Sequence, residues 1–138
     1  MGEDIRVLIV DDSQSMRMEL REKYQSFGYD VVGEAENGLV ALDLIKELSP
    51  DLVSLDIIMP EMDGIECYRL MRSMESPPRC LFVSALANEP RVIEAYRNEI
   101  SVTHYVSKNI SNEDLKNKIS EVMNAPALPE PEQTEQRD

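Results

Sequence analysis

Short apolar runs alternate with longer amphipathic segments along most of this chain. Five runs of four to six residues are mostly apolar or β-branched, as in strands that are covered on both faces of a parallel sheet. The predicted strands are residues 5–10, 30–35, 52–55, 80–83 and 103–106. Each run ends in polar or turn-forming residues, which favours short strands joined by longer connections.

The connections carry apolar residues at three- and four-residue spacing, which is typical of amphipathic helices. In the first connection Ser13 fits a helix N-cap, and the apolar stripe continues until Gly28, a natural C-terminal stop. The other predicted helices begin near Gly38, Ile65, Pro90 and Ser111 and end near Leu48, Met74, Asn98 and Asn124. Five β-α units in succession predict an α/β fold, a doubly wound parallel sheet of five strands flanked by five helices.

The composition fits one domain. The chain has 138 residues, 42% of them apolar, which is enough for a single buried core. We assign this domain to residues 1–124. Residues 125–138 hold three prolines and four acidic residues without periodicity, so we expect a disordered acidic tail there.

Charge and cysteine usage exclude several functions. Lys and Arg total 14 against 27 for Asp and Glu, a net charge of −13, so the surface would repel nucleic acids. No apolar stretch reaches the roughly 18 residues of a membrane span, and we expect a cytoplasmic protein without membrane insertion. Cys67 and Cys80 lack companions at metal-ligand spacing, which favours two reduced, apolar side chains.

Chemistry-bearing residues follow the predicted strands. In doubly wound sheets ligands bind outside the carboxyl ends of the strands. The residues at these ends are Asp11, Asp12, Asp56, Ser84 and Lys108. Three carboxylates in one crevice repel each other unless a divalent cation lies among them, and an oxygen-rich site suits Mg²⁺, with Mn²⁺ as an alternative. The hydroxyl and the ammonium add donors for a phosphoryl group, and Asp56, alone at its strand end, is the best candidate for a phosphoryl acceptor.

These residues resemble those of the receiver domain of two-component response regulators, the CheY-like family. The resemblance is carried by residues 10–13 (VDDS), 55–64 (LDIIMPEMDG), 84–85 (SA) and 105–108 (YVSK), and it runs from about residue 4 to 123. It implies the strand order 2-1-3-4-5. It also implies that Asp56 accepts a phosphoryl group from the phosphohistidine of a sensor histidine kinase.

The resemblance assigns further roles. Asp12 would bind the metal directly and Asp11 mainly through water, together with Asp56 and the backbone carbonyl of Ile58. Ser84, the backbone of Ala85 and Lys108 would bind the phosphoryl oxygens. Tyr105 would be the aromatic switch, whose ring turns inward when Ser84 moves, although a plain strand aromatic is the competing interpretation.

A phosphoryl group would thereby bias a surface for a downstream protein target. That surface comprises residues 90–98, 103–106 and the helix after Ser111. We expect a switch and not an enzyme, apart from self-catalysed phosphoryl transfer and autodephosphorylation. A monomer or a weak phosphorylation-dependent dimer is expected.

Two departures from the family pattern stand out, one at Asn109 and one in the stretch between Ser84 and Lys108, which is longer than is common. Asn109 replaces the proline that usually follows the lysine through a cis bond, and a cis bond to Asn costs roughly 3 kcal/mol more than trans. We therefore expect a rearranged or strained loop there. Ile58 and Leu86, two positions after Asp56 and Ser84, have no group to orient an attacking water, which predicts slow self-dephosphorylation. The competing interpretation is that both side chains only pack against the loop.

Several functions stay open on the sequence alone. We favour a stand-alone receiver without an output domain, with chemotaxis or motility signalling as one pathway and a phosphorelay shuttle as another. The alternatives are a degenerate receiver that docks partners without phosphorylation, a small phosphoester hydrolase, and a segment of a longer regulator.

Overall fold

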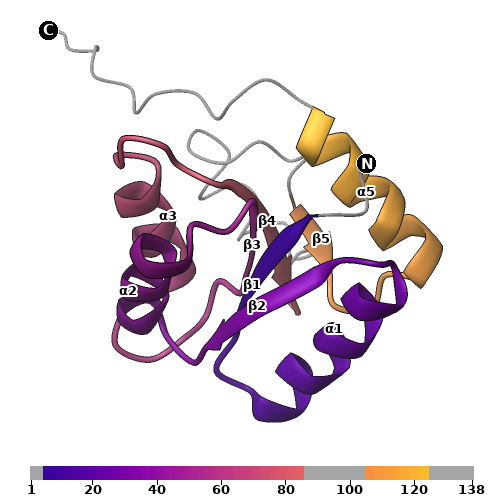
Figure 1. The fold of residues 1–138 in the computed structure, drawn as a ribbon. Coiled ribbons are helices and arrows are strands. Elements are labelled where there is room, and N and C mark those ends of the chain that lie inside the picture. Colours follow the sequence, from indigo (N-terminus) through magenta and orange to yellow (C-terminus); the bar gives the residue numbers. More distant parts are fainter. Residues whose placement is uncertain (1–4, 86–104, 125–138) are drawn as a thin grey trace, which may run out of the picture.

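Five parallel strands form the centre of the molecule. The computed structural model describes residues 5–85 and 105–124. The strands are hydrogen-bonded in the order β2-β1-β3-β4-β5, as expected (Figure 1). Their bounds are β1 Arg6–Val10, β2 Asp30–Ala35, β3 Leu52–Leu55, β4 Arg79–Ser84 and β5 Tyr105–Ser107. The order places β1 and β3 side by side, so the residues that follow them lie at the same edge of the sheet.

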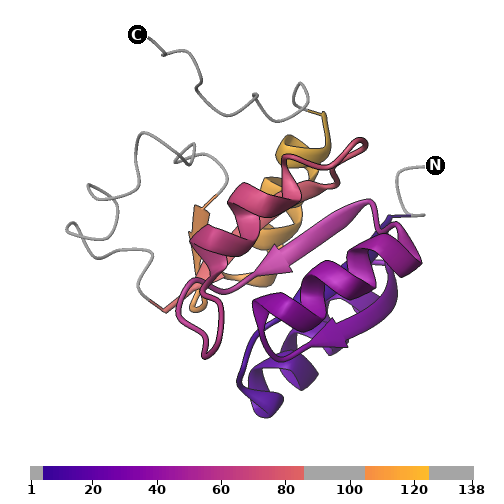
Figure 2. The same cartoon turned by 90° about the vertical axis from the view of Figure 1, so that its left-hand side faces the viewer.

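Helices cover both faces of this sheet. In the described residues these are α1 Gln14–Ser26, α2 Gly38–Leu48, α3 Gly64–Met71 and α5 Asn112–Asn124. Helices α1 and α5 lie on one face, and α2 and α3 lie on the other (Figures 1 and 2). The predicted helix at 90–98 and the predicted tail at 125–138 lie outside the described residues.

Alternation along the central strands produces two hydrophobic cores. Leu8 and Val10 of β1 pack toward α2 and α3, whereas Val7 and Ile9 pack toward α1 and α5. All four side chains are at most 1% exposed. A strand that is buried on both faces has no polar alternation, which is why β1 reads as a continuous apolar run.

The helix starts agree with the capping residues in the sequence. Ser13 Oγ accepts a hydrogen bond from the Met16 amide at 3.2 Å, and Asn37 Oδ1 accepts one from the Val40 amide at 2.9 Å. The end of α1 also agrees, because Gly28 follows it with a φ of +91°, a conformation that glycine adopts without strain.

Several predicted boundaries were inaccurate. Strand β1 begins at Arg6 and not at residue 5, and β4 extends one residue beyond the predicted 80–83 at each end. Helix α3 ends at Met71 and not at Met74. The Met74 amide donates to the Met71 carbonyl at 3.1 Å in a tighter turn, while the Met74 side chain still packs against the core, so the apolar spacing outlasts the helix. Strand β5 continues to Ser107, one residue beyond the predicted end, and residues 103–104 lie outside the described residues.

Candidate functional site

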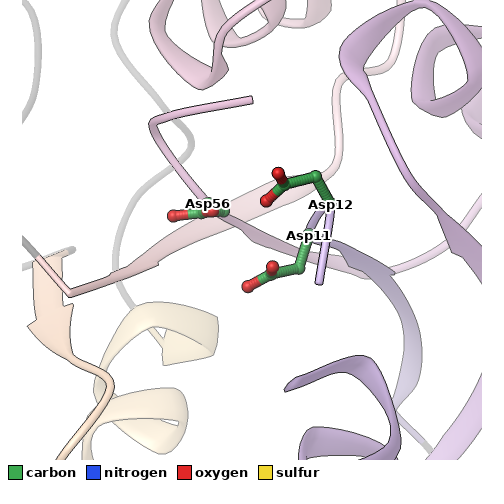
Figure 3. Close-up of side chains that lie close together, drawn as sticks. All are labelled: Asp11, Asp12 and Asp56. Atoms are coloured by element: carbon green, nitrogen blue, oxygen red, sulfur yellow. The ribbon is translucent and has the colours of Figure 1, made fainter. Parts of the chain in front are cut away.

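Three carboxylates meet where β1 and β3 end. Each of Asp11, Asp12 and Asp56 has a carboxylate oxygen within 4.8 Å of the other two, and the three side chains project toward the same side (Figure 3). Asp11 and Asp56 are 1% and 5% exposed, whereas Asp12 is open to solvent. The expected convergence of these acidic residues is therefore present in the structure.

Lys108 joins the cluster from the segment after β5. Its Nζ lies 2.9 Å from Asp11 Oδ2 and 3.6 Å from Asp56 Oδ2. Its backbone N–H donates to the Ser84 carbonyl at 3.2 Å, which ties the ends of β4 and β5 together. One ammonium thus pairs with two of the three carboxylates, and the cluster keeps a surplus of negative charge.

Asp11 is fixed through its backbone and its side chain. Its amide donates to the Ala35 carbonyl at 3.0 Å, and its Oδ1 accepts from the Ser13 amide at 2.9 Å. Its carbonyl accepts from Arg17 Nη1 at 2.7 Å. The first turn of α1 and the end of β2 together hold this aspartate.

Asp56 is positioned by close backbone packing. Its amide donates to the Val10 carbonyl at 2.9 Å, and its Oδ1 accepts from the Ile57 amide at 2.8 Å. Gly64 packs on this turn, because its amide donates to the Ile57 carbonyl at 2.7 Å. A Cβ on Gly64 would lie 2.0 Å from the Asp56 carbonyl oxygen, so only glycine fits.

The electrostatics of the cluster favour a cation. Burial, and then the nearby Asp11 charge, raise the pKa of Asp56 to about 6, although Lys108 opposes this shift. Burial lowers the pKa of Lys108, but its hydrogen bond to Asp11 and the Asp56 charge outweigh burial and raise it overall. Hard oxygen ligands with excess negative charge, one of them open to solvent, are the donor set that Mg²⁺ prefers.

The other predicted residues lie at or after the ends of β3 and β4 and on β5, except Leu86, which lies outside the described residues. Ser84 is buried at the end of β4, opposite Ser107 of β5, and Ala85 is exposed in the turn that follows. The Ile58 side chain is 58% exposed. The half-buried Tyr105 begins β5, with its ring centroid 6.1 Å from that of Phe82.

The segment after Lys108 contains no cis peptide bond. The described residues hold none, so the bond between Lys108 and Asn109 is trans. The Asn109 amide donates to Ser107 Oγ at 3.1 Å. This hydrogen bond requires an N–H that a proline would lack.

The structure adds two charged residues that the sequence interpretation missed. Arg17 of α1 and Glu34 of β2 form an ion pair, with Arg17 Nε 3.0 Å from Glu34 Oε1. Their only signal in the sequence was a charged residue inside a predicted buried strand. Such a residue needs a partner, but the sequence does not say which.

The two cysteines are free and buried, as expected. Burial, and then the nearby Asp63 charge, raise the pKa of the Cys67 thiol to about 12. Burial also raises the pKa of Cys80. Both side chains therefore behave as apolar core residues.

Comparison with known proteins decides the family. The family described as "Response regulator receiver domain" matches residues 7–120. The chain belongs to this family. The predicted fold and family are thereby confirmed, and with them a place in two-component signalling.

Chemotaxis proteins are among the relatives of this receiver. It is 44% identical to chemotaxis protein CheY of Bacillus subtilis over 90 residues, which are 65% of this chain and 75% of that protein. It is also 44% identical to CheY of Thermotoga maritima over 92 residues, covering 67% of this chain and 77% of that protein.

Solved receiver structures superpose on most of the chain. The response regulator domain of Thermotoga maritima CheB has a TM-score of 0.73 at 36% identity, covering 89% of this chain and 98% of that one. A chain of the CheX–CheY–BeF₃–Mg²⁺ complex of Borrelia burgdorferi has a TM-score of 0.76 at 28% identity, covering 88% of this chain and 90% of that one. In the described residues of this receiver, no helix has the length and apolarity needed to cross a membrane.

Proposed function

We propose that this receiver is a Mg²⁺-dependent phosphorylation switch in which Asp56 accepts a phosphoryl group from the phosphohistidine of a histidine kinase. The observation that carries the proposal is the position of Asp56. It is buried at the end of β3, within 4.8 Å of two other carboxylates and 3.6 Å from the Lys108 ammonium.

Each of these residues has a defined task. Asp12, Asp11 through water, Asp56 and the Ile58 carbonyl would hold Mg²⁺. When bound, the ion neutralises negative charge on the phosphoryl oxygens and on Asp56. Lys108 pairs with a phosphoryl oxygen, and the Ser84 hydroxyl and the Ala85 N–H donate to the others.

The transfer itself requires an ionised acceptor. An Asp56 carboxylate oxygen bonds to phosphorus while the phosphorus–nitrogen bond of the kinase phosphohistidine breaks, and the electron pair remains on the imidazole. With a pKa of about 6, Asp56 is mainly ionised at neutral pH. The protein turns over no separate substrate in this scheme, so we propose a switch and not an enzyme.

Phosphorylation would be transmitted through Tyr105. Its half-buried ring begins β5, and Lys108 follows three residues later. Pairing of Ser84 and Lys108 with a phosphoryl group would open space for the Tyr105 ring and change the surface around β5 and α5. Its target would be a downstream protein in the cytoplasm, and the CheY relatives and the CheX–CheY complex favour a chemotaxis pathway.

Intact-protein mass spectrometry tests the proposal. The chain is incubated with acetyl phosphate and Mg²⁺, with and without EDTA, beside Asp56→Asn and Asp51→Asn. Asp51 is the matched control because it is an exposed acid at the opposite end of β3. We expect one added phosphoryl group in the wild type and in Asp51→Asn, and none with EDTA or in Asp56→Asn.

A second probe tests the site even if the protein accepts a phosphoryl group only from its kinase and not from acetyl phosphate. Beryllofluoride with Mg²⁺ should bind the wild type without any kinase and shift the NMR signals of residues around Asp56. If neither a phosphoryl adduct nor beryllofluoride binding is observed, the proposed phosphorylation switch is wrong. A docking module that acts without phosphorylation is then the better explanation.

A further inference from the structure

A network of charged side chains connects the acidic cluster to Glu34 of β2, which is an edge strand of the sheet. Arg17 Nη1 donates to the Asp11 carbonyl at 2.7 Å, and Arg17 Nε donates to Glu34 Oε1 at 3.0 Å. Arg21 Nε donates to the second oxygen of Glu34, Oε2, at 2.6 Å. The two arginines thus share one carboxylate, but only Arg17 is shown to continue to the acidic cluster.

The carbonyl that Arg17 holds belongs to the peptide that joins Asp11 to Asp12. A peptide unit is planar, so fixing its oxygen also fixes the direction of the Asp12 N–Cα bond. Asp12 itself is exposed. Its carboxylate is therefore aimed mainly by the backbone that carries it.

Glu34 keeps Arg17 in the orientation that this contact needs. Burial alone would raise the pKa of Glu34, but hydrogen bonds from Arg21 and Arg17 outweigh it and lower the pKa, so the carboxylate stays charged. The Arg17 side chain is 15% exposed, and that of Glu34 is 26% exposed. A guanidinium presents donors in a rigid fork, so one nitrogen can bind Glu34 while another binds the Asp11 carbonyl.

We propose that Arg17, held in place by Glu34, is a positioning residue for the metal site and orients the peptide between Asp11 and Asp12. The inference rests on the proposed function, because it assumes that Asp12 binds Mg²⁺. In this scheme Arg17 would touch neither the metal nor the phosphoryl group. It acts through the backbone, and its contribution is the geometry of the Asp12 carboxylate.

The decisive variant is Arg17→Lys, which keeps the positive charge and loses the fork. Isothermal titration calorimetry measures the Mg²⁺ dissociation constant of the full chain. Outer residues that orient metal ligands typically contribute 10- to 100-fold in metal affinity. We expect Mg²⁺ binding to weaken about 10-fold in Arg17→Lys. Arg21→Lys is the matched control, because Arg21 also pairs with Glu34, and we expect its Mg²⁺ affinity to stay within about 2-fold of the wild type.

A kinetic measurement separates positioning from general damage. The rate of phosphorylation by acetyl phosphate is measured as a function of Mg²⁺ concentration. We expect Arg17→Lys to need about 10-fold more Mg²⁺ for half-maximal rate, with a nearly unchanged rate at saturation. Urea unfolding of both arginine variants shows whether they are comparably stable. If Arg17→Lys does not fold, Glu34→Gln takes its place, because it weakens the hold on Arg17 without removing a cation.

The outcomes distinguish the inference from the proposed function. If the wild type binds no Mg²⁺, the proposed function fails first. If the wild type binds Mg²⁺ and Arg17→Lys binds it equally well, the positioning role is wrong while the proposed function stands. Equal weakening in Arg17→Lys and Arg21→Lys would also overturn it, because the effect would then come from the weakened contacts with Glu34 that both variants share and not from the contact of Arg17 with Asp11.

Discussion

The two segments that deliver the acidic residues are built in different ways. The first segment, residues 11–13, and the second segment, residues 56–63, each follow a buried strand and begin with an aspartate of the cluster. Each also ends in a residue that caps the next helix, Ser13 for α1 and Asp63 for α3. The first is held by a backbone hydrogen bond to Ala35 of β2 and by the Arg17 side chain, whereas the second is held by backbone packed against backbone.

The two segments should therefore differ in how well they tolerate amino-acid substitutions. The Asp11 carbonyl depends on a hydrogen bond from Arg17, which can be weakened in small steps by substitution. The second segment includes Glu61 in a left-handed conformation, with a φ of +73°, inside a turn in which the Met62 amide donates to the Pro60 carbonyl at 2.7 Å. A tight turn with this backbone conformation tolerates few substitutions.

The largest expected effect comes from adding one methyl group at Gly64. In Gly64→Ala the Cβ would lie 2.0 Å from the Asp56 carbonyl oxygen, and no side-chain rotation relieves this clash, because the backbone fixes the position of a Cβ. We expect a loss of more than about 4 kcal/mol in the free energy of unfolding, measured by urea denaturation. Gly33→Ala is the control, because its Cβ would meet a movable Leu48 methyl group at 3.0 Å. Equal losses in both variants would contradict the comparison.

A second prediction concerns the charge on Asp56. A rise in pKa from 3.8 to about 6 means that the folded protein binds this proton more tightly than the unfolded chain. The wild type therefore loses stability as the pH rises from about 4 to about 6, and a shift of this size corresponds to about 3 kcal/mol. Without Mg²⁺ we expect Asp56→Asn to exceed the wild type in unfolding free energy at pH 7.5, and the difference to shrink toward pH 4.

Magnesium provides the control for this prediction. Saturating Mg²⁺ binds the native wild type and should stabilise it, so the advantage of Asp56→Asn at pH 7.5 should decrease or reverse. The stability difference is followed by urea unfolding at several pH values with EDTA or Mg²⁺. A difference that does not vary with pH would show that the Asp56 charge does not cause it.

The same comparison explains what the sequence could predict. The strand ends were predictable because buried parallel strands are continuous apolar runs, and parallel strands place their carboxyl ends at one edge. The convergence of Asp11 and Asp56 follows from that rule. The role of Gly64 was visible as a turn signal, but its contact with the Asp56 backbone depends on the path of the whole second segment.

The Arg17 network could not be predicted in the same way. It depends on the register between β1 and β2, which shifts between Val7 and Leu8 and places Glu34 beside Ile9. It also depends on the rotation of α1, which brings Arg17 and Arg21 to the same carboxylate. Neither the register shift nor the rotation follows from local patterns of apolar residues.

A smaller effect is expected at the two helix caps. Ser13 Oγ accepts from the Met16 amide at 3.2 Å, and Asp63 Oδ1 accepts from the Glu66 amide at 2.9 Å. Removing a cap of this kind costs about 1 kcal/mol, so Ser13→Ala and Asp63→Ala should each lose that much in urea unfolding. Asp63→Asn keeps the acceptor and should stay near the wild type. A loss in Asp63→Asn as large as in Asp63→Ala would show that charge, and not capping, matters there.

The smallest effect on stability and a clear effect on kinetics are expected at Ile58. Its side chain is 58% exposed in the second segment, two residues after Asp56, so replacement by Asn should change the unfolding free energy by less than about 0.5 kcal/mol. An apolar side chain cannot orient a water toward the phosphoryl group, whereas an amide can hydrogen-bond one. We therefore expect the phosphorylated Ile58→Asn protein to lose its phosphoryl group faster than the wild type. Decay of the adduct mass after removal of the phosphodonor measures this rate, with Ile58→Val as the apolar control. An unchanged rate in Ile58→Asn would mean that this exposed side chain only covers the segment, and that access of water to Asp56 is controlled elsewhere.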